Sequence, residues 1–262
     1  MYEYIDIHAH LDMSAFDKDR EELILKLQKE KIGVITIGVD KKSSFWAVEL
    51  AEKHDNVFAS IGCHPTDATE NFCESDFMEL ARHSKVVAIG ECGLDFFRAK
   101  DESATEKNRQ KKLFETQVDF AVEYKKPLMI HCRDAHKEVL DILKSKKKEF
   151  GDKLRGNIHF FSGDVKIAKQ YFELDFSVSF GGALTFTRDY DEVVRYAPLE
   201  KIMSETDAPF VAPIPYRGKR NEPIFIKEVT RKIAEIKGKD LAKIKEILVQ
   251  NAKNMFALPD EL

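Results

Sequence analysis

The sequence predicts a single α/β domain folded as a (β/α)8 TIM barrel. Segments typical of strands alternate with segments typical of helices along the whole chain, in eight successive units. Repeated strand–helix units favour a parallel sheet, and eight of them favour a closed barrel. The length of 262 residues fits this fold, because such barrels commonly have about 250 residues. An open doubly wound sheet is the alternative, but no GxGxxG turn follows the first strand.

The first four strand–helix units span residues 4–125. Apolar, β-branched segments such as the run at 33–39 are typical of strands that are buried on both faces. Apolar residues at helical spacing predict the helices between them, and Ser43 is a candidate N-cap of the second helix. The strands are expected at 4–8, 33–39, 57–62 and 86–90, and the helices at 17–31, 43–54, 75–83 and 104–125.

The last four units follow the same pattern, and helices close the chain. Strands are expected at 127–130, 155–158, 174–180 and 200–204, and helices at 136–149, 164–173 and 189–197. Residues 222–237 and 240–256 are expected to form one or two closing helices. No linker-like composition shift, repeat or low-complexity tract interrupts the sequence, so we treat 1–262 as one domain.

The composition restricts the partners and the compartment. The formal net charge is -4, which lacks the basic excess of proteins that coat long nucleic acids. The four cysteines form no CxxC pair, and three of them follow apolar strand segments, where buried free thiols and a reducing compartment are expected. No signal-like segment and no run of 18 apolar residues is present. We therefore expect a cytoplasmic monomer (or a nuclear one in a eukaryote) without membrane contact.

Side chains that can ligate metals follow six of the expected strands. In a barrel, the carboxyl ends of all strands meet on one face, so these side chains should converge there. Five of the eight histidines are among them, whereas His54, His83 and His136 fall in helical segments. The converging residues are His8 and His10, His64, Glu91, His131, His159, and the pair Glu205 and Asp207.

The number of ligands indicates two divalent metal ions. One ion can take His8, His10, Glu91 and Asp207, and the other can take His131 and His159 with Glu91 as a bridge. Two ions about 4 Å apart are a recurrent device for phosphoester hydrolysis. Asp207 is the candidate to orient the attacking water or to accept its proton. Mixed nitrogen and oxygen ligands suit Zn²⁺, Mn²⁺ or Fe²⁺, and Mg²⁺ stays open as well.

Seven motifs in register carry a resemblance that spans nearly the whole chain. They are HAHLD at 8–12, SIGCHP at 60–65, IGECGLDFF at 89–97, PLMIHCRDA at 127–135, IHFFSG at 158–163, SETDAPF at 204–210 and RGKRNEP at 217–223. With these motifs the chain resembles the TatD family of metal-dependent deoxyribonucleases. One departure is Phe160, where members often have cysteine.

The resemblance implies roles for individual residues. It implies a contact between His64 and a substrate phosphate close to the metals, and a place for Glu205 beside the metals or the substrate. Catalysis is then expected from Asp207, Glu91 and His64. The metal ligands implied are His8, His10, Glu91, His131, His159 and Asp207.

Other residues near the motifs have two interpretations each. Arg133 can contact a phosphate or form a salt bridge within its loop, and Arg217 and Arg220 can contact phosphate or merely solubilise a loop. Asp95 is expected to orient the turn that contains Gly93. Asp6 and Asp12 can support an imidazole ring or face solvent, and Gly181 and Gly182 can admit substrate or form a tight turn. Cys92 is expected to be a packed thiol. One or two phenylalanines could stack on bases, from Phe96, Phe97, Phe160, Phe161, Phe180 and Phe186.

The predicted function is the hydrolysis of DNA phosphodiester bonds by a two-metal mechanism. The acidic net charge favours a short footprint at strand ends or on single strands, and so an exonuclease that prefers single-stranded DNA. The expected 3′–5′ direction is what the resemblance implies. An amidohydrolase-like enzyme that cleaves an amide, lactone or acyl ester is the first alternative. Related sites of that type often use a carboxylated lysine as the bridge, and here the position is Glu91. A non-catalytic metal-dependent binding protein is the second alternative.

Overall fold

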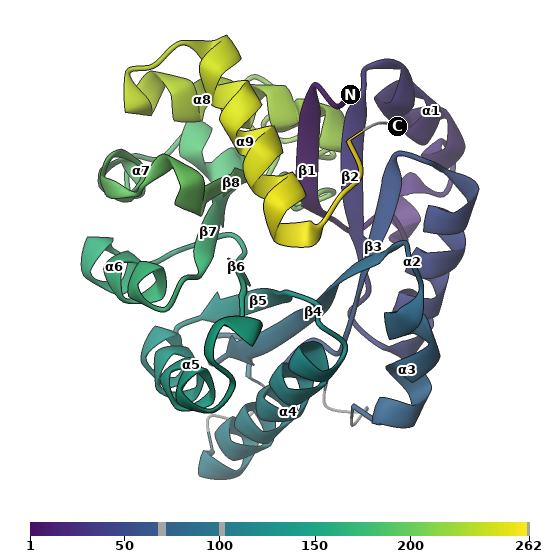
Figure 1. The fold of residues 1–262 in the computed structure, drawn as a ribbon. Helices are drawn as coiled ribbons and strands as arrows, with labels where there is room; N and C mark the ends of the chain where they lie inside the picture. The colour runs from purple at the N-terminus through teal and green to yellow at the C-terminus, as the bar shows by residue number, and fades with distance from the viewer. Residues whose placement is uncertain (68–71, 100–102, 261–262) are drawn as a thin grey trace.

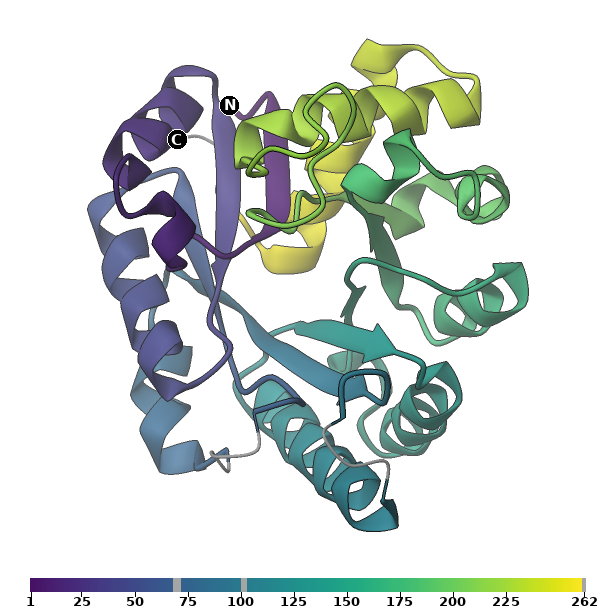
Figure 2. The same ribbon diagram turned by 180° about the vertical axis from the view of Figure 1, so that it is seen from behind.

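The computed structural model describes residues 1–67, 72–99 and 103–260, and it confirms the predicted barrel. Its eight strands form one sheet in chain order, and every adjacent pair is parallel. Helices follow the strands and surround the sheet in a single domain (Figures 1 and 2). The strands are β1 (Tyr4–Ala9), β2 (Ile32–Ile37), β3 (Val57–Ile61), β4 (Val86–Asp95), β5 (Leu128–Arg133), β6 (Gly156–Ile158), β7 (Ser177–Phe180) and β8 (Ile202–Ser204).

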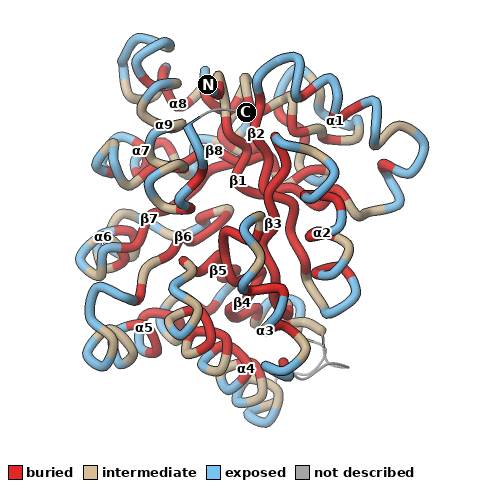
Figure 3. Tube along the Cα trace, turned by 45° about the vertical axis from the view of Figure 1, so that its right-hand side comes forward, coloured by how far each residue is buried: buried red, intermediate tan, exposed pale blue. Residues whose placement is uncertain are grey.

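The helices bury one face each against the sheet. Figure 3 shows this division, with buried strands inside and exposed outer faces on the helices. The α-helices among the described residues are α1 (Arg20–Lys29), α2 (Lys41–Lys53), α3 (Glu74–Arg82), α4 (Ala104–Glu123), α5 (His136–Phe150), α6 (Val165–Glu173), α7 (Asp191–Tyr196), α8 (Ile226–Lys237) and α9 (Leu241–Phe256).

The core has two parts. The larger apolar cluster lies between the strands and the surrounding helices. A smaller cluster combines strand residues such as Ile7, Ile35 and Met129 with Phe256 of α9, so the last helix covers one end of the barrel. The site described below lies where the strands end.

Backbone contacts join β1 to the segment after β8 and nearly close the barrel. Ala9 forms a parallel bridge with Ala208, and the backbone N–H of His10 donates to the carbonyl of Ala208 at 2.7 Å. The N–H of Asp207 donates to the carbonyl of His8 at 2.9 Å. Residues from the two ends of the chain are thereby held side by side.

Two strands run further than the sequence predicted. β4 continues to Asp95 and β5 to Arg133, so Glu91 and His131 lie within strands and not directly after them. The β4–β5 register shifts between Ile89 and Cys92, which leaves one extra residue in β4 at this point. Such a bulge redirects a side chain, and here it involves Glu91.

The predicted N-cap of α2 was wrong by three positions. Asp40 is the N-cap, and its carboxylate accepts the backbone N–H of Ser43 at 2.6 Å. The hydroxyl of Ser43 accepts the N–H of Asp40 at 3.0 Å, which completes a reciprocal capping box. The helix therefore begins at Lys41.

Candidate metal centre

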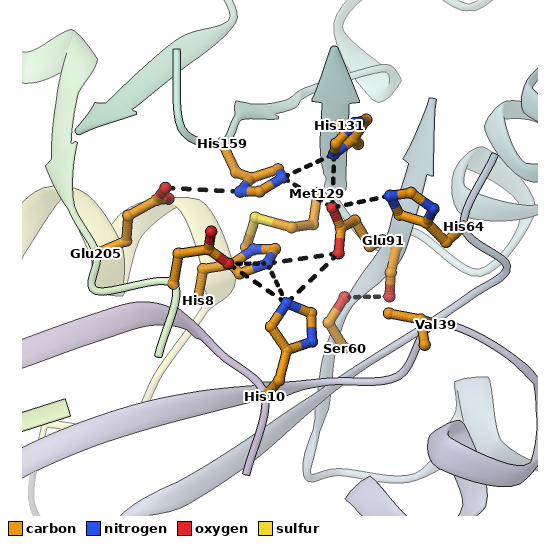
Figure 4. Close-up of polar contacts among 12 residues, drawn as sticks. His8, His10, Val39, Ser60, His64, Glu91, Met129, His131, His159 and Glu205 are labelled. Atoms are coloured by element: carbon orange, nitrogen blue, oxygen red, sulfur yellow. Dashed lines mark hydrogen bonds and ion pairs between the residues drawn. The ribbon is translucent and has the colours of Figure 1, made fainter. Parts of the chain in front are cut away.

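Imidazole and carboxylate side chains from six strands or strand ends converge on one point, as the sequence predicted. Figure 4 shows the labelled imidazole and carboxylate groups pointing toward one another around Glu91, which lies between the histidines at β1, in β5 and directly after β6. We divide them into a first cluster (His8, His10 and Asp207) and a second cluster (Glu91, His131 and His159).

The first cluster joins the end of β1 to the segment after β8. The Nε2 atoms of His8 and His10 are 3.3 Å apart. Oδ1 of Asp207 lies 3.4 Å from Nε2 of His10 and 3.8 Å from Nε2 of His8. Two nitrogens that bind the same ion, each about 2.1 Å from it, would lie roughly this far apart. Asp207 has a φ of +56°, a conformation that Asp adopts more readily than most residues.

Glu91 links the two clusters through its two carboxylate oxygens. Its Oε1 lies 2.8 Å from Nδ1 of His131 and 2.9 Å from Nε2 of His159. Its Oε2 faces the first cluster, 3.5 Å from Nε2 of His8 and 3.7 Å from Nε2 of His10. The geometry expected of a bridging carboxylate is therefore present.

Asp95 determines which nitrogen of His131 faces the second cluster. Its Oδ2 lies 3.0 Å from Nε2 of His131, so in the neutral ring Nε2–H donates to Asp95 and Nδ1 offers a lone pair to the cluster. The sequence assigned Asp95 to the Gly93 turn, which misses this contact. The signal was its position in β4, four residues after Glu91 on the same strand face.

His64 points one nitrogen into the second cluster. Its Nε2 lies 3.5 Å from Oε1 of Glu91. The backbone N–H of Thr66 donates to its Nδ1 at 3.2 Å, so in the neutral ring the proton is on Nε2. Burial lowers the pKa of His64, which favours this neutral form. His64 can thus donate a hydrogen bond into the pocket.

Glu205 is fully buried beside the clusters, the place near the metals that the resemblance implied, and it is not among the residues that line the pocket. Its Oε1 lies 3.5 Å from Nδ1 of His159 on the side away from Glu91. Its Oε2 accepts the hydroxyl of Ser179 at 2.6 Å, and Oγ of Ser179 accepts from Nδ2 of Asn157 at 2.7 Å. This buried chain of polar groups orients His159.

The charges in the centre are strongly coupled. Burial alone raises the pKa of Glu91, but the positive charge of His159 and hydrogen bonds from His131 and His159 hold it well below its usual range. Burial opposes protonation of His159, yet the negative charges of Glu91 and Glu205 raise its pKa well above normal. The pKa of Asp207 is lowered because the hydrogen bond with His10 and nearby imidazole charges outweigh its burial.

Two glutamines of α4 hold the backbone of the site, and the sequence analysis missed both. Gln117 accepts the N–H of Cys63 at 2.8 Å and donates to its carbonyl at 3.0 Å, directly before His64. Gln110 makes the same pair of bonds to Asp95, at 2.9 and 3.1 Å. Both are fully buried at positions seven apart, which places them on one face of the helix.

A glycine on β4 allows the close approach of β5. Gly93 has a φ of +135°, and a Cβ there would lie 2.0 Å from the carbonyl oxygen of His131. After β7, a Cβ on Gly182 would lie 2.1 Å from the carbonyl oxygen of Val211. Gly182 therefore admits the neighbouring loop, a packing role that the sequence analysis did not name.

The clusters form the floor of a pocket of about 800 Å³. His10, His64, Glu91, His131, His159 and Asp207 line it, as do Arg98, Arg133, Phe160 and Phe210. Arg133 stacks its guanidinium over Phe97 at 5.1 Å, and among the described residues it forms no salt bridge.

Other predicted residues lie outside this pocket. Arg217 stacks on Phe186 at 3.8 Å and donates to the carbonyl of Ala212, and it is not among the lining residues. Arg220 forms ion pairs with Asp19 and Glu222, so its role is to hold its loop against the start of α1.

Further candidates are part of the buried interior. Asp6 accepts the backbone N–H groups of His8 and Thr206 and does not contact an imidazole ring, and burial raises its pKa to about 8. Phe161 and Phe180 are buried in the core, and Cys92 is the buried thiol that the sequence predicted.

The residues present fit divalent metal ions. Glu91 is buried and Asp207 is partly buried, and within the described ranges their side chains pair only with histidines and with no Lys or Arg. Buried carboxylates need compensating positive charge, which bound cations would supply. The Nδ1 atoms of His8 and His10 have no hydrogen-bond partner, so these rings depend on their Nε2 contacts.

An eight-stranded barrel with such clusters at its strand ends defines the class of metal-dependent hydrolases, and the comparisons with known proteins agree. The chain belongs to the TatD family, because the model of TatD related DNases matches residues 5–257. It is 39% identical to the metal-dependent hydrolase YabD of Bacillus subtilis, over 97% of this chain and 98% of that protein. It is 30% identical to YcfH of Escherichia coli, over 96% of this chain and 95% of that protein.

Solved structures show the same fold. The crystal structure of the TatD homologue YjjV of Escherichia coli superimposes with a TM-score of 0.88 at 25% identity, covering 98% of this chain and 99% of that one. A TatD family hydrolase of Entamoeba histolytica gives a TM-score of 0.84 at 21% identity, over 98% of this chain and 99% of that one. No described helix is long and apolar enough to cross a membrane.

Proposed function

We propose that this chain is a deoxyribonuclease that hydrolyses phosphodiester bonds with two divalent ions, Mg²⁺, Mn²⁺ or Zn²⁺. The observation that carries the proposal is the position of Glu91, whose two oxygens face two separate groups of ligands. His8, His10 and Asp207 would hold one ion, and His131 and His159 the other, with Glu91 shared. Bound together, two such ions acidify a water and neutralise charge on a phosphate.

The protein groups around the clusters suit a phosphodiester. The Nε2–H of His64 points into the pocket, where it can donate to a phosphate oxygen. Arg133 lies two residues beyond His131 and lines the same pocket, and guanidinium forks match phosphate oxygens. Asp207 keeps a low pKa, so it is ionised and can orient a water or accept its proton.

The limited positive charge of the pocket supports the proposed mode of attack. Arg98 and Arg133 are the only Lys or Arg residues that line the pocket in the described part of the chain, so few phosphates can be held at once. This supports a short footprint, and so action at the end of a single strand. The 3′–5′ direction and the monomeric state are further parts of the proposal. The alternative amide, lactone or ester hydrolase would use the same clusters. The lining contains no lysine that could serve as a carboxylated bridge.

The test is cleavage of end-labelled single-stranded DNA by metal-stripped protein, with Mg²⁺, Mn²⁺ and Zn²⁺ added back separately. A ladder of shortened products that needs metal and is absent in Glu91→Ala is expected. Labels at the 5′ and 3′ ends distinguish the two directions. Turnover of amide or ester substrates without cleavage of DNA would overturn the proposal and favour the alternative.

A further inference from the structure

Phe210 is an exposed aromatic side chain at the rim of the pocket. It is 45% exposed and lines the pocket three residues after Asp207. Its ring meets that of His10 edge to face, with centroids 6.0 Å apart. Figure 4 places His10 at the edge of the centre opposite His131, so Phe210 lies beside the first cluster. No sequence motif singled out this residue as a contact for bases.

The backbone of Phe210 is fixed from two sides. Its N–H donates to the carbonyl of Asp207 at 2.8 Å. Its carbonyl accepts Nδ2 of the fully buried Asn221 at 2.6 Å, and Nδ2 also donates to Thr206 at 2.7 Å. The ring is thus presented to solvent by an ordered loop. Binding a ligand there costs little additional ordering of the chain.

Chemically, the two sides of the pocket differ. On the side of the first cluster, Phe210 and Val211 form a mostly apolar surface. On the side of the second cluster lies Arg133, whose guanidinium is held over Phe97. A nucleotide has the same division into a flat apolar face and an anionic phosphate, and base–aromatic stacking accepts every base.

We propose that Phe210 is the residue on which the nucleobase next to the scissile phosphate stacks. This inference rests on the proposed function, because it places the phosphate between the clusters. The base then lies on the side of His10, and the rest of the strand extends toward Arg133. Such an arrangement binds a nucleotide without selecting a particular base.

A fluorescence titration tests this without turnover. Phe210→Trp places an indole at the rim, and Phe45→Trp places one on α2, where Phe45 is 44% exposed and does not line the pocket. We expect thymidine 5′-monophosphate to quench Phe210→Trp, and 2-deoxyribose 5-phosphate, which lacks the base, to leave it unquenched. Phe45→Trp and the native Trp46 should not respond to either. Equal responses to both ligands, or no response of Phe210→Trp, would overturn the proposal.

A kinetic comparison adds a second readout. The substrates are a short thymidine oligonucleotide and the same strand with an abasic terminal residue. Wild type should favour the strand with the base, and Phe210→Ala should reduce this preference by about tenfold, the scale of one lost stacking contact. Phe45→Ala should keep the preference. If wild type cleaves DNA but Phe210→Ala keeps the full preference for the strand with the base, the stacking role is refuted. If wild type cleaves no DNA, the proposed function fails. The fluorescence titration then still decides whether Phe210 stacks on a base.

Discussion

The imidazole rings of His8 and His159 lie face to face, with centroids 3.8 Å apart and 4° between their planes. His8 lies in β1 and His159 directly follows β6, two strands that are not neighbours in the sheet, and the two residues belong to different clusters. Burial lowers the pKa of His8, and the positive charge of His159 lowers it further. His8 is therefore neutral, with a lone pair available for a metal. The stacked rings join the two clusters into one unit.

The first prediction concerns metal content. His10→Ala removes a ligand of the first cluster only, so the protein should keep one of two bound ions. Glu91→Ala removes the shared carboxylate and should lose both. Elemental analysis after dialysis against trace metal measures this directly. His83→Ala is the control, because His83 pairs with Glu52 on the outside. Equal metal content in His10→Ala and Glu91→Ala would contradict the bridging role.

The second prediction concerns Glu205. Glu205→Gln keeps the size of the side chain but replaces the carboxylate beside Nδ1 of His159 with an amide. We expect metal affinity to fall by about 10–100-fold, the usual effect of losing the group that orients a ligand. Zn²⁺ titration with a competing chelator measures it, and circular dichroism verifies the fold. Unchanged affinity in a folded variant would show that the contact has no influence on metal binding.

The third prediction concerns Gln117. Gln117→Ala removes two side-chain hydrogen bonds to the buried backbone of Cys63. The free energy of unfolding should fall by on the order of 2 kcal/mol, because each lost hydrogen bond contributes about 0.5–1.5 kcal/mol. Urea denaturation measures the loss, with Gln28→Ala on the exposed surface of α1 as the matched control. A loss no larger than in the control would mean that the backbone of Cys63 finds other partners.

The fourth prediction concerns pH and His136. Burial lowers the pKa of His136 from 6.5 to about 4, and its Nε2 is buried without a hydrogen-bond partner. Between pH 4 and 6.5 the unfolded chain binds a proton on this ring more readily than the folded chain does. The stability of the fold that depends on neutral His136 is therefore fully present above pH 6.5, and it is lost as the pH falls toward 4. The full difference corresponds to at most about 3 kcal/mol.

The measurement is the melting temperature of wild type and His136→Asn between pH 4 and 7. The variant lacks this titrating group, so its melting temperature should fall less steeply with decreasing pH. The metal-centre histidines are present in both proteins and cancel in the comparison. Parallel curves for the two proteins would contradict the assignment to His136.

The sequence by itself determined the barrel and which residues converge. Alternating apolar and amphipathic segments encode strands and helices locally, and parallel βα units bring all strand ends to one face. For that reason His8, Glu91, His131 and His159 could be placed together before any coordinates were known.

The sequence proposed how these side chains divide between two ions, but only the tertiary structure decided the distances between them and what orients them. The bulge that redirects Glu91, the contact of Asp95 with His131 and the burial of Glu205 depend on strand register and on packing across the barrel. Likewise, Gln117 reaches Cys63 across 54 positions of the chain, and Phe210 meets His10 because the ends of the barrel close on one another. Local sequence patterns carry no information about such distances, since they are determined by which surfaces pack together once the sheet closes.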